Sequence, residues 1–414
     1  MKKIVFLFLL TGLFSCKKEA EVIENKIKED VVFLADDKLE GRQTGTEGEV
    51  KASKYIVKRF KEIGLQPKGT EDFLQPFSFK PKTDPHKEVE FTKNSDSTIT
   101  GRNVIGYIDN SAKTTVVIGA HYDHLGYGGE GSLYRGKEKA VHNGADDNAS
   151  GVAVMLNLAS RLKVKNDTAK IKDNNNYMFL AFSGEEMGLL GSNFFSKNPT
   201  ISAESINYMI NMDMVGRLKA DSTLAVYGTG TSPIFKQTIK SNNDAFKLVE
   251  HESGVGPSDH TSFYLIDVPV LQFFTGQHED YHKPDDDADK LNYEGMDLIS
   301  DYIYTIISDL DDNGELAFRK TKNESEETPR FKVGLGVVPD YLFDGKGMRI
   351  DGTREETPAF NAGLQKGDIV IKLGDSTVTD MMSYMRALSV FDKGDEAPIT
   401  VKRGEETIDT TVKF

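Results

Sequence analysis

Acidic and imidazole side chains follow four apolar segments of this sequence. The segments end in, or run into, His121, Asp123 and His124; Glu185 and Glu186; Asp213; and His278, Asp280, Tyr281 and His282. The motif HNGADDNASG adds Asp146 and Asp147 between the first two segments. Imidazole and carboxylate groups suit zinc and similar divalent ions, and a shared carboxylate can hold two ions together. These residues therefore predict a metal site, at which one glutamate of the pair 185–186 could act as general base.

Each motif taken alone has a simpler interpretation. Adjacent glutamates often begin a solvated helix, where the helix dipole favours acids. GADDNASG is also compatible with a turn and a helix cap. Four histidines are expected to lie at the surface or to support the ligands rather than bind metal: His124, His142, His251 and His278. The metal-site hypothesis depends on all the motifs meeting at one place.

The elements that would bring them together are the strands of a parallel sheet. Short apolar runs rich in β-formers alternate with helical stretches from residue 103 onward, which is typical of an α/β domain. The predicted strands are 103–108, 114–120, 177–182, 206–212, 224–228 and 268–274, and a helix is predicted over 295–310. Two more helices are predicted over residues 27–41 and 46–65, the second closed by Gly64. Ligands of open α/β sheets bind at the carboxyl ends of the strands, so we expect the site there.

The length and composition indicate a soluble globular protein of several domains. The chain has 414 residues and a net charge of −14, which argues against a nucleic-acid partner. We predict a metal-binding domain over 22–312, a polar linker over 313–330 and a small β-rich domain over 331–414.

The amino terminus has the layout of a signal peptide. Two lysines precede an apolar stretch over residues 4–14, and the only cysteine, Cys16, follows. One cysteine excludes both a disulfide framework and a thiolate zinc site. Residues 1–16 resemble a bacterial lipoprotein signal, which implies export to the periplasm or cell envelope and a membrane anchor through a lipid on Cys16.

Residues 30–310 resemble the co-catalytic zinc aminopeptidases, a family with related carboxypeptidases and glutaminyl cyclases. The motifs AHYDH, GADDNASG, FSGEEMGLLGS, NMDMVGR, PSDHTSF and YHKPDD occur in the family order. The resemblance implies a three-layer α/β/α domain with a mostly parallel, mixed central sheet. It implies two zinc ions, one held by His121 and Asp213, the other by Glu186 and His282, with Asp147 bridging them.

The same resemblance implies the remaining roles. Glu185 would be the general base, Asp123 would orient His121, and Tyr281 would hydrogen-bond the developing oxyanion. Residues 258–263 would line the substrate pocket. The expected activity is removal of the first residue from peptides with a free amino terminus. The alternatives are carboxypeptidase or glutaminyl cyclase chemistry on the same scaffold, or a non-catalytic peptide-binding lipoprotein.

Residues 331–414 resemble a PDZ domain. VGLGVVPD, residues 333–340, resembles the carboxylate-binding loop and the strand that follows it, and residues 357–378 resemble the core of that family. The resemblance implies binding of a carboxyl-terminal peptide by strand addition. The alternative is a domain that only packs against the peptidase or shields its entrance.

Overall fold

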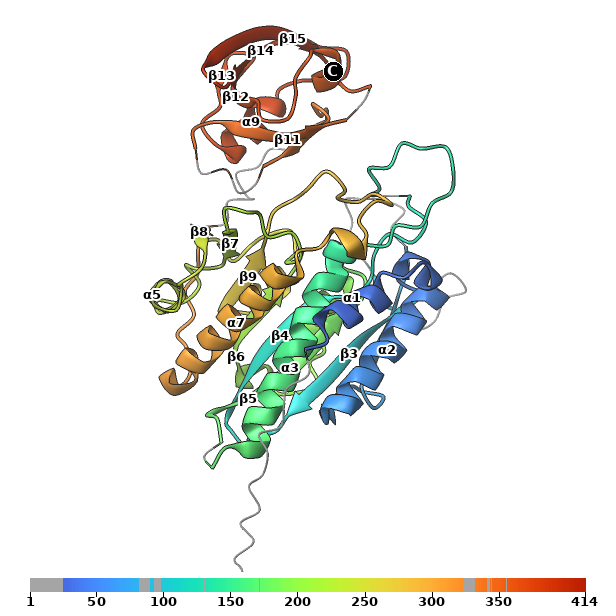
Figure 1. Ribbon diagram of the computed structural model, residues 1–414, viewed down its shortest axis with the longest axis vertical. Helices are drawn as coiled ribbons and strands as arrows, with labels where there is room; N and C mark the ends of the chain where they lie inside the picture. Colours follow the sequence, from blue (N-terminus) through green and yellow to red (C-terminus); the bar gives the residue numbers. More distant parts are fainter. Residues whose placement is uncertain are drawn as a thin grey trace, which may run out of the picture.

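The computed structural model describes residues 25–81, 90–92, 98–129, 131–170, 172–322, 332–340, 343, 345–354 and 356–414. They form an α/β domain followed by a smaller β-rich domain (Figure 1). The predicted signal peptide and Cys16 lie outside these residues. No helix within them is long and apolar enough to cross a membrane.

A nine-stranded sheet forms the middle layer of the first domain, in the order β1-β3-β5-β4-β6-β9-β7-β8, with β2 paired to β3. The strands are β1 (Gln66–Pro67), β2 (Leu74–Phe79), β3 (Ile99–Ile108), β4 (Thr114–His121), β5 (Asn175–Phe182), β6 (Ile206–Met212), β7 (Thr223–Tyr227), β8 (Lys247–Glu250) and β9 (Val270–Phe274). The central strands β5, β4, β6 and β9 are parallel to their neighbours in this group. Antiparallel pairs at β3–β5 and β7–β9 flank them. The predicted mostly parallel, mixed sheet is confirmed.

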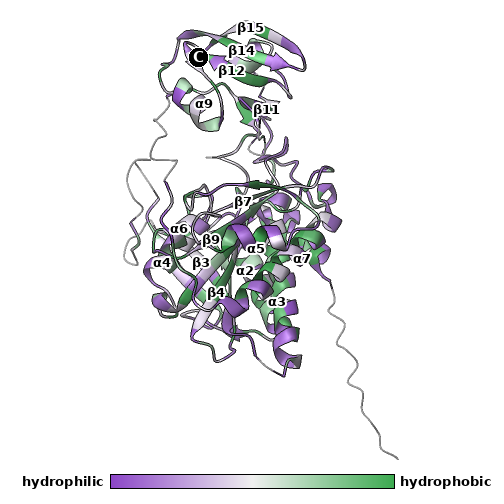
Figure 2. Ribbon diagram, turned by 90° about the vertical axis from the view of Figure 1, so that its left-hand side faces the viewer, coloured by the Kyte–Doolittle hydropathy of each residue, from purple (hydrophilic) through white to green (hydrophobic). Residues whose placement is uncertain are grey.

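Helices cover both faces of this sheet. They are α1 (Ile27–Leu34), α2 (Glu47–Ile63), α3 (Gly151–Thr168), α4 (Leu190–Lys197), α5 (Phe235–Ser241), α6 (His260–Tyr264) and α7 (Tyr293–Leu310). α3 packs on α1 and α7 over one face, and α4 packs on α6 over the other. Figure 2 shows hydrophobic residues concentrated on the strands and hydrophilic residues on the outer helix faces. The apolar strands are thus enclosed between two helical layers.

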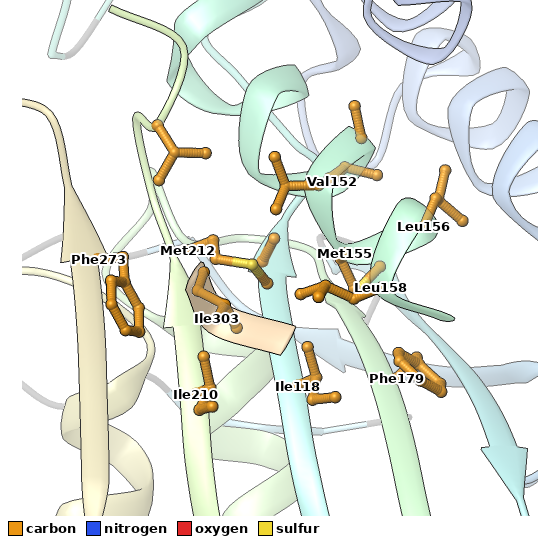
Figure 3. Close-up of a cluster of buried hydrophobic side chains, with 14 of the residues drawn as sticks. Ile118, Val152, Met155, Leu156, Leu158, Phe179, Ile210, Met212, Phe273 and Ile303 are labelled. Carbon is orange, nitrogen blue, oxygen red and sulfur yellow. The ribbon is translucent and has the colours of Figure 1, made fainter. Parts of the chain in front are cut away.

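The main core lies between the sheet and helices α3 and α7. Figure 3 shows Ile118, Ile210 and Phe273 of three neighbouring strands beneath Met155 of α3. All of these side chains are fully buried. Because both faces of the central strands are covered, β5 and β6 are buried along their whole length, as expected for parallel strands. This packing holds each strand in place along its own direction and so determines where its carboxyl end lies.

The amino-terminal region differs in part from its prediction. The first helix ends at Leu34, and a 3₁₀ turn, η1 (Asp37–Arg42), follows it. Gly64 caps α2 as predicted, with a φ of 85° that favours glycine. β1 and β2, for which no strand was predicted, lie at the margin of the sheet. β1 has only two residues, both exposed, and Pro76 interrupts the apolar residues of β2, which explains the weak signal.

The predicted linker begins as a packed segment. Leu316 is buried against the main core. The backbone N–H of Arg319 donates to the Thr231 carbonyl at 2.7 Å, and the Tyr264 hydroxyl donates to the Thr321 carbonyl at 3.2 Å. The first domain therefore holds the chain as far as residue 321.

The second domain has a separate core and a six-stranded sheet. Its elements are β10 (Val337–Pro339), β11 (Met348–Thr353), α8 (Pro358–Asn361), β12 (Ile369–Leu373), β13 (Ser376–Thr377), α9 (Met381–Leu388), β14 (Glu396–Arg403) and β15 (Glu406–Lys413). In Figures 1 and 2, β11 and α9 lie on the side toward the first domain, and β15 lies on the far side.

Candidate active site

His121, the last residue of β4, lies between two carboxylates at the carboxyl edge of the sheet. Its Nε2 is 3.3 Å from Asp147 Oδ1 and 3.4 Å from Asp213 Oδ1. Asp213 directly follows β6, the neighbour of β4, whereas Asp147 lies in the turn before α3. One atom from each of these three residues could ligate the same cation.

A second group lies on the other side of Asp147. His282 Nε2 is 3.2 Å from Asp147 Oδ2 and 3.3 Å from Glu186 Oε2. His124 Nδ1 is 2.7 Å from Glu186 Oε1, and it also lies 4.0 Å from Asp147 Oδ2. The two oxygens of Asp147 thus face two different groups of ligands, which is the arrangement expected of a carboxylate between two metal ions.

The unpaired polar atoms in these groups fit divalent cations. Four buried atoms have no hydrogen-bond partner in the described parts of the chain: His121 Nε2, His124 Nδ1, His124 Nε2 and Glu186 Oε1. Leaving such atoms unsatisfied costs about 1–3 kcal/mol each, and metal coordination would remove that cost. Imidazole nitrogen and carboxylate oxygen are ligands that zinc accepts.

His124 was predicted to lie at the surface or to support the ligands, and the structure instead places it among them. It is completely buried, and among the described residues the possible ligand group with Asp147 and Glu186 contains His124 rather than His282. His282 nevertheless lies within 3.3 Å of both acids. The available signal was its position in AHYDH, three residues after His121. Of the other set-aside histidines, His142 lies 2.7 Å from the Ser132 hydroxyl and His251 stacks on Tyr227.

Asp123 connects β4 to the loop that carries the two glutamates. Its Oδ1 accepts the backbone N–H of Glu185 at 3.1 Å, and its Oδ2 accepts the Thr44 hydroxyl at 3.0 Å. His121 Nδ1 lies 3.7 Å from Asp123 Oδ1 and 3.2 Å from the Asp123 carbonyl oxygen. The backbone and side chain of Asp123 both face this ring nitrogen, so Nε2 is turned toward Asp147.

Glu185 lies in the same acidic cluster. Burial raises its pKa well above that of a free glutamate, although His121 opposes the shift. Burial also raises the pKa of Asp259 to about 7, again opposed by His121. Asp259 belongs to the 258–263 segment that was expected to line the pocket. A carboxylate with a raised pKa accepts protons more readily, which suits a general base.

Tyr281 stacks on His282, with ring centroids 3.8 Å apart. Burial raises the pKa of its phenol well above the usual value, and the charges of Asp147 and Glu186 add to the shift. The hydroxyl therefore stays protonated at neutral pH. A protonated phenol at this place can donate a hydrogen bond to a developing oxyanion.

Buried residues behind the ligands hold three loops together. Asp286 Oδ2 accepts the backbone N–H groups of Asp146 and Asp147, at 2.9 and 3.1 Å. Asp146 Oδ1 accepts the Gly216 N–H at 2.6 Å, and its Oδ2 lies 3.2 Å from His278 Nε2. His278 thus supports the ligand loops, as expected. Asp280 forms an ion pair with Arg217 at 2.7 Å. It therefore also holds the loops together and belongs to neither ligand group.

Arg42 joins the amino-terminal segment to the floor of the site. Its guanidinium donates to the carbonyl oxygens of Leu34, Tyr122, Asn143 and Gly144, at distances between 2.5 and 3.0 Å. Burial lowers its pKa to about 10, while the charges of Asp123 and Asp147 resist the change. Arg42 thus stays charged and balances part of the acidic cluster.

Replacing Arg42 by methionine is expected to lower the free energy of unfolding by about 3 kcal/mol, because four buried carbonyls lose a charged donor. Urea unfolding followed by circular dichroism measures the change. Arg319→Met serves as the matched control, since the Arg319 side chain is exposed. Equal stability of the two variants would contradict the structural role given to Arg42.

The fold and this site define a class of protein: an α/β protein with two groups of possible metal ligands at the carboxyl edge of its sheet. Residues 103–307 match the family model "Peptidase family M28", and residues 319–414 match the model "PDZ domain". The chain belongs to peptidase family M28 and carries a carboxyl-terminal PDZ domain. The PDZ match begins ahead of the predicted start at residue 331.

Known proteins that resemble this chain include aminopeptidases and a glutaminyl cyclase. A probable leucine aminopeptidase of Trichophyton verrucosum is 30% identical over 177 residues, which cover 40% of this chain and 44% of the relative. The chain therefore spans less than half of that relative. The solved aminopeptidase from Aneurinibacillus sp. strain AM-1 has a TM-score of 0.53 at 19% identity, covering 72% of this chain and 95% of the other. Porphyromonas gingivalis glutaminyl cyclase has a TM-score of 0.54 at 17% identity, covering 69% and 97%. At these identities, the solved structures establish a common fold.

Proposed function

We propose that the protein is an exported aminopeptidase that uses two zinc ions to hydrolyse the first peptide bond of peptides. The observation that carries the proposal is the position of Asp147, whose two carboxylate oxygens face separate ligand groups. His121 and Asp213 would hold one ion. Glu186 and His282 would hold the other, with His124 close enough to share it. The probable leucine aminopeptidase of Trichophyton verrucosum supports this assignment of activity.

The residues around the ligands would perform proton transfer. Two zinc ions bound there would polarise the scissile carbonyl and lower the pKa of a water molecule. Glu185 would accept the proton of the attacking water and pass it to the leaving amine. Tyr281 would donate a hydrogen bond to the carbonyl oxygen as negative charge develops on it.

The acidic surroundings also supply a reason for specificity toward the amino terminus. Asp259 is buried, Glu185 and Asp213 are half-buried, and the charges of all three interact with His121. A substrate ammonium would be attracted to this cluster, because opposite charges interact strongly where water is excluded. A blocked amino terminus lacks that charge.

The proposal extends to the cell envelope and to the PDZ domain. Export and lipid attachment at Cys16 depend on the sequence of residues 1–16. Binding of a carboxyl-terminal peptide depends on the loop of residues 333–340 and on strand addition to β10.

The decisive experiment compares amino-acid arylamides with their N-acetylated forms, before and after chelation of the metal. We expect metal-dependent hydrolysis of the free amines alone, with activity restored by zinc. An amino-terminal glutamine peptide is included to detect cyclisation. Cyclisation without hydrolysis would replace this proposal by the glutaminyl cyclase alternative. Protein that holds two metal ions and acts on none of these compounds would favour a carboxypeptidase or a binding protein.

A further inference from the structure

A cavity of about 210 Å³ lies between the first domain and the segment that leads to the PDZ domain. Residues 319–322 form one wall, and the match to the PDZ model begins at residue 319. The turn after β7 and the start of α5 form another wall. A water molecule in the liquid occupies about 30 Å³, so the cavity has room for a small polyatomic anion together with water.

Backbone hydrogen bonds hold the walls of this cavity together. The Thr231 carbonyl accepts the backbone N–H of Arg319 at 2.7 Å, and the Thr231 hydroxyl accepts the N–H of Val270 at 2.9 Å. The Thr321 hydroxyl accepts the N–H of Gly254 at 3.0 Å. Val270 is the first residue of β9, whereas the possible metal ligands follow the carboxyl ends of the strands. The cavity is therefore separate from the candidate active site.

Basic side chains dominate the lining of the cavity. It includes one acid, Glu252, and four bases: Lys236, Arg319, Lys320 and Lys322. Lys236 forms an ion pair with Glu252. Within the described part of the chain, no carboxylate lies at ion-pair distance from the other three bases. Positive charges around one cavity repel each other and attract anions, although the chain as a whole carries a charge of −14.

The lining also contains a buried hydroxyl that lacks a partner. Ser232 is 2% exposed, and its Oγ forms no hydrogen bond within the residues that the structure describes. Buried polar atoms nearly always have a partner, and a serine hydroxyl can donate one hydrogen bond. Ser232 thus points to a ligand with an acceptor oxygen, independently of the charges.

We propose that this cavity binds a doubly charged tetrahedral oxyanion, either free sulfate or phosphate or the phosphate group of a small molecule. Ser232 and Arg319 donate hydrogen bonds to its oxygens. Lys320 and Lys322 balance its charge, and a single carboxylate would leave more of the positive charge uncompensated. Because Ser232 belongs to the first domain and the three bases belong to the connecting segment, the bound anion holds that segment against the first domain. This site does not depend on the proposed peptidase activity.

The test titrates sulfate into the full-length protein by isothermal calorimetry in a buffer of low ionic strength, because salt screens exposed charges. We expect one sulfate to bind per chain. Arg319→Gln and Ser232→Ala should each raise the Kd about tenfold, the effect of losing one hydrogen bond to a charged group. Glu252→Gln should lower the Kd, because it removes the only acid of the lining.

Two controls accompany these variants. Lys240→Gln changes an exposed lysine of α5 that pairs with Glu250 at 3.0 Å and does not line the cavity, so its Kd should equal that of wild type. Ser232→Ala removes a hydroxyl without a protein partner, so its free energy of unfolding in urea should also equal that of wild type.

The outcomes separate this cavity from other anion sites. Sulfate that binds equally well to wild type, Arg319→Gln and Ser232→Ala lies elsewhere, for example on bound metal ions, and would overturn the proposal. Absence of saturable binding to wild type would also overturn it, as would acetate that binds as tightly as sulfate.

A comparison of inorganic phosphate with glycerol phosphate identifies the source of the oxyanion. Equal affinity supports a free ion, and tighter binding of the ester that Arg319→Gln weakens supports the phosphate group of a larger molecule.

Discussion

Replacing Glu185 by glutamine is expected to lower kcat about a thousandfold, because the amide cannot accept a proton from the attacking water. Glutamine has nearly the same size as glutamate, and the backbone N–H of residue 185 can still donate its hydrogen bond to Asp123. Glu185 belongs to neither possible ligand group, so the variant should still bind two zinc ions. Steady-state hydrolysis of an arylamide, together with metal analysis of the same sample, measures both properties.

The control for this variant is Glu315→Gln. Glu315 is exposed and lies in the segment after α7, away from the ligand groups. It should retain wild-type kcat and metal content. Undiminished hydrolysis by Glu185→Gln would show that another group is the base, and loss of its metal would show that Glu185 is a ligand.

Replacing Asp147 by asparagine is expected to remove both metal ions and to abolish hydrolysis. The two oxygens of Asp147 lie 3.3 Å from His121 and 3.2 Å from His282, so one substitution reaches both groups. A neutral amide presents a single oxygen without charge. Changing a residue that only supports a ligand lowers metal affinity by up to about 100-fold. Because Asp147 would be a ligand itself, we expect the affinity for each ion to fall by more than about 100-fold.

Asp213→Asn provides the matched comparison, because Asp213 contacts His121 and belongs to only one of the two groups. This variant should bind one ion more weakly and should keep the other ion bound. Metal content after dialysis against a weak chelator, with circular dichroism to verify folding, distinguishes the variants. A folded Asp147→Asn protein that retains two ions would contradict the shared role of Asp147.

The elements that the sequence predicted well are those with an unbroken apolar pattern. β4, β5 and β6 read as strands because both of their faces are buried, which requires continuous apolar residues. β1 and β2 were not predicted, since β1 has only two exposed residues and Pro76 interrupts the apolar residues of β2. The first helix was predicted too long because its apolar spacing continues into η1, where Glu40 and Gly41 leave helical geometry.

Some of the residues that support the site, such as Arg42 and Asp286, could not be found from sequence. Arg42 donates to the carbonyl of Asn143, and Asp286 accepts from Asp147, although each pair is separated by more than a hundred positions. A lone arginine or aspartate in a polar segment has no local pattern that marks it as buried. His124 is a similar case, because one residue in a loop can place its ring toward solvent or toward Glu186.

The sequence by itself determined the fold class, the family and the order of the ligand motifs. It could do so because strand patterns and residues at strand ends are local features, and parallel strands bring their carboxyl ends to one edge. Only the tertiary structure decided which side chains meet there, including His124 beside Glu186 and Lys219 beside Asp340 and Asp351. Those meetings depend on loop paths and on the packing of one domain against another, which are set by contacts between residues far apart in the chain.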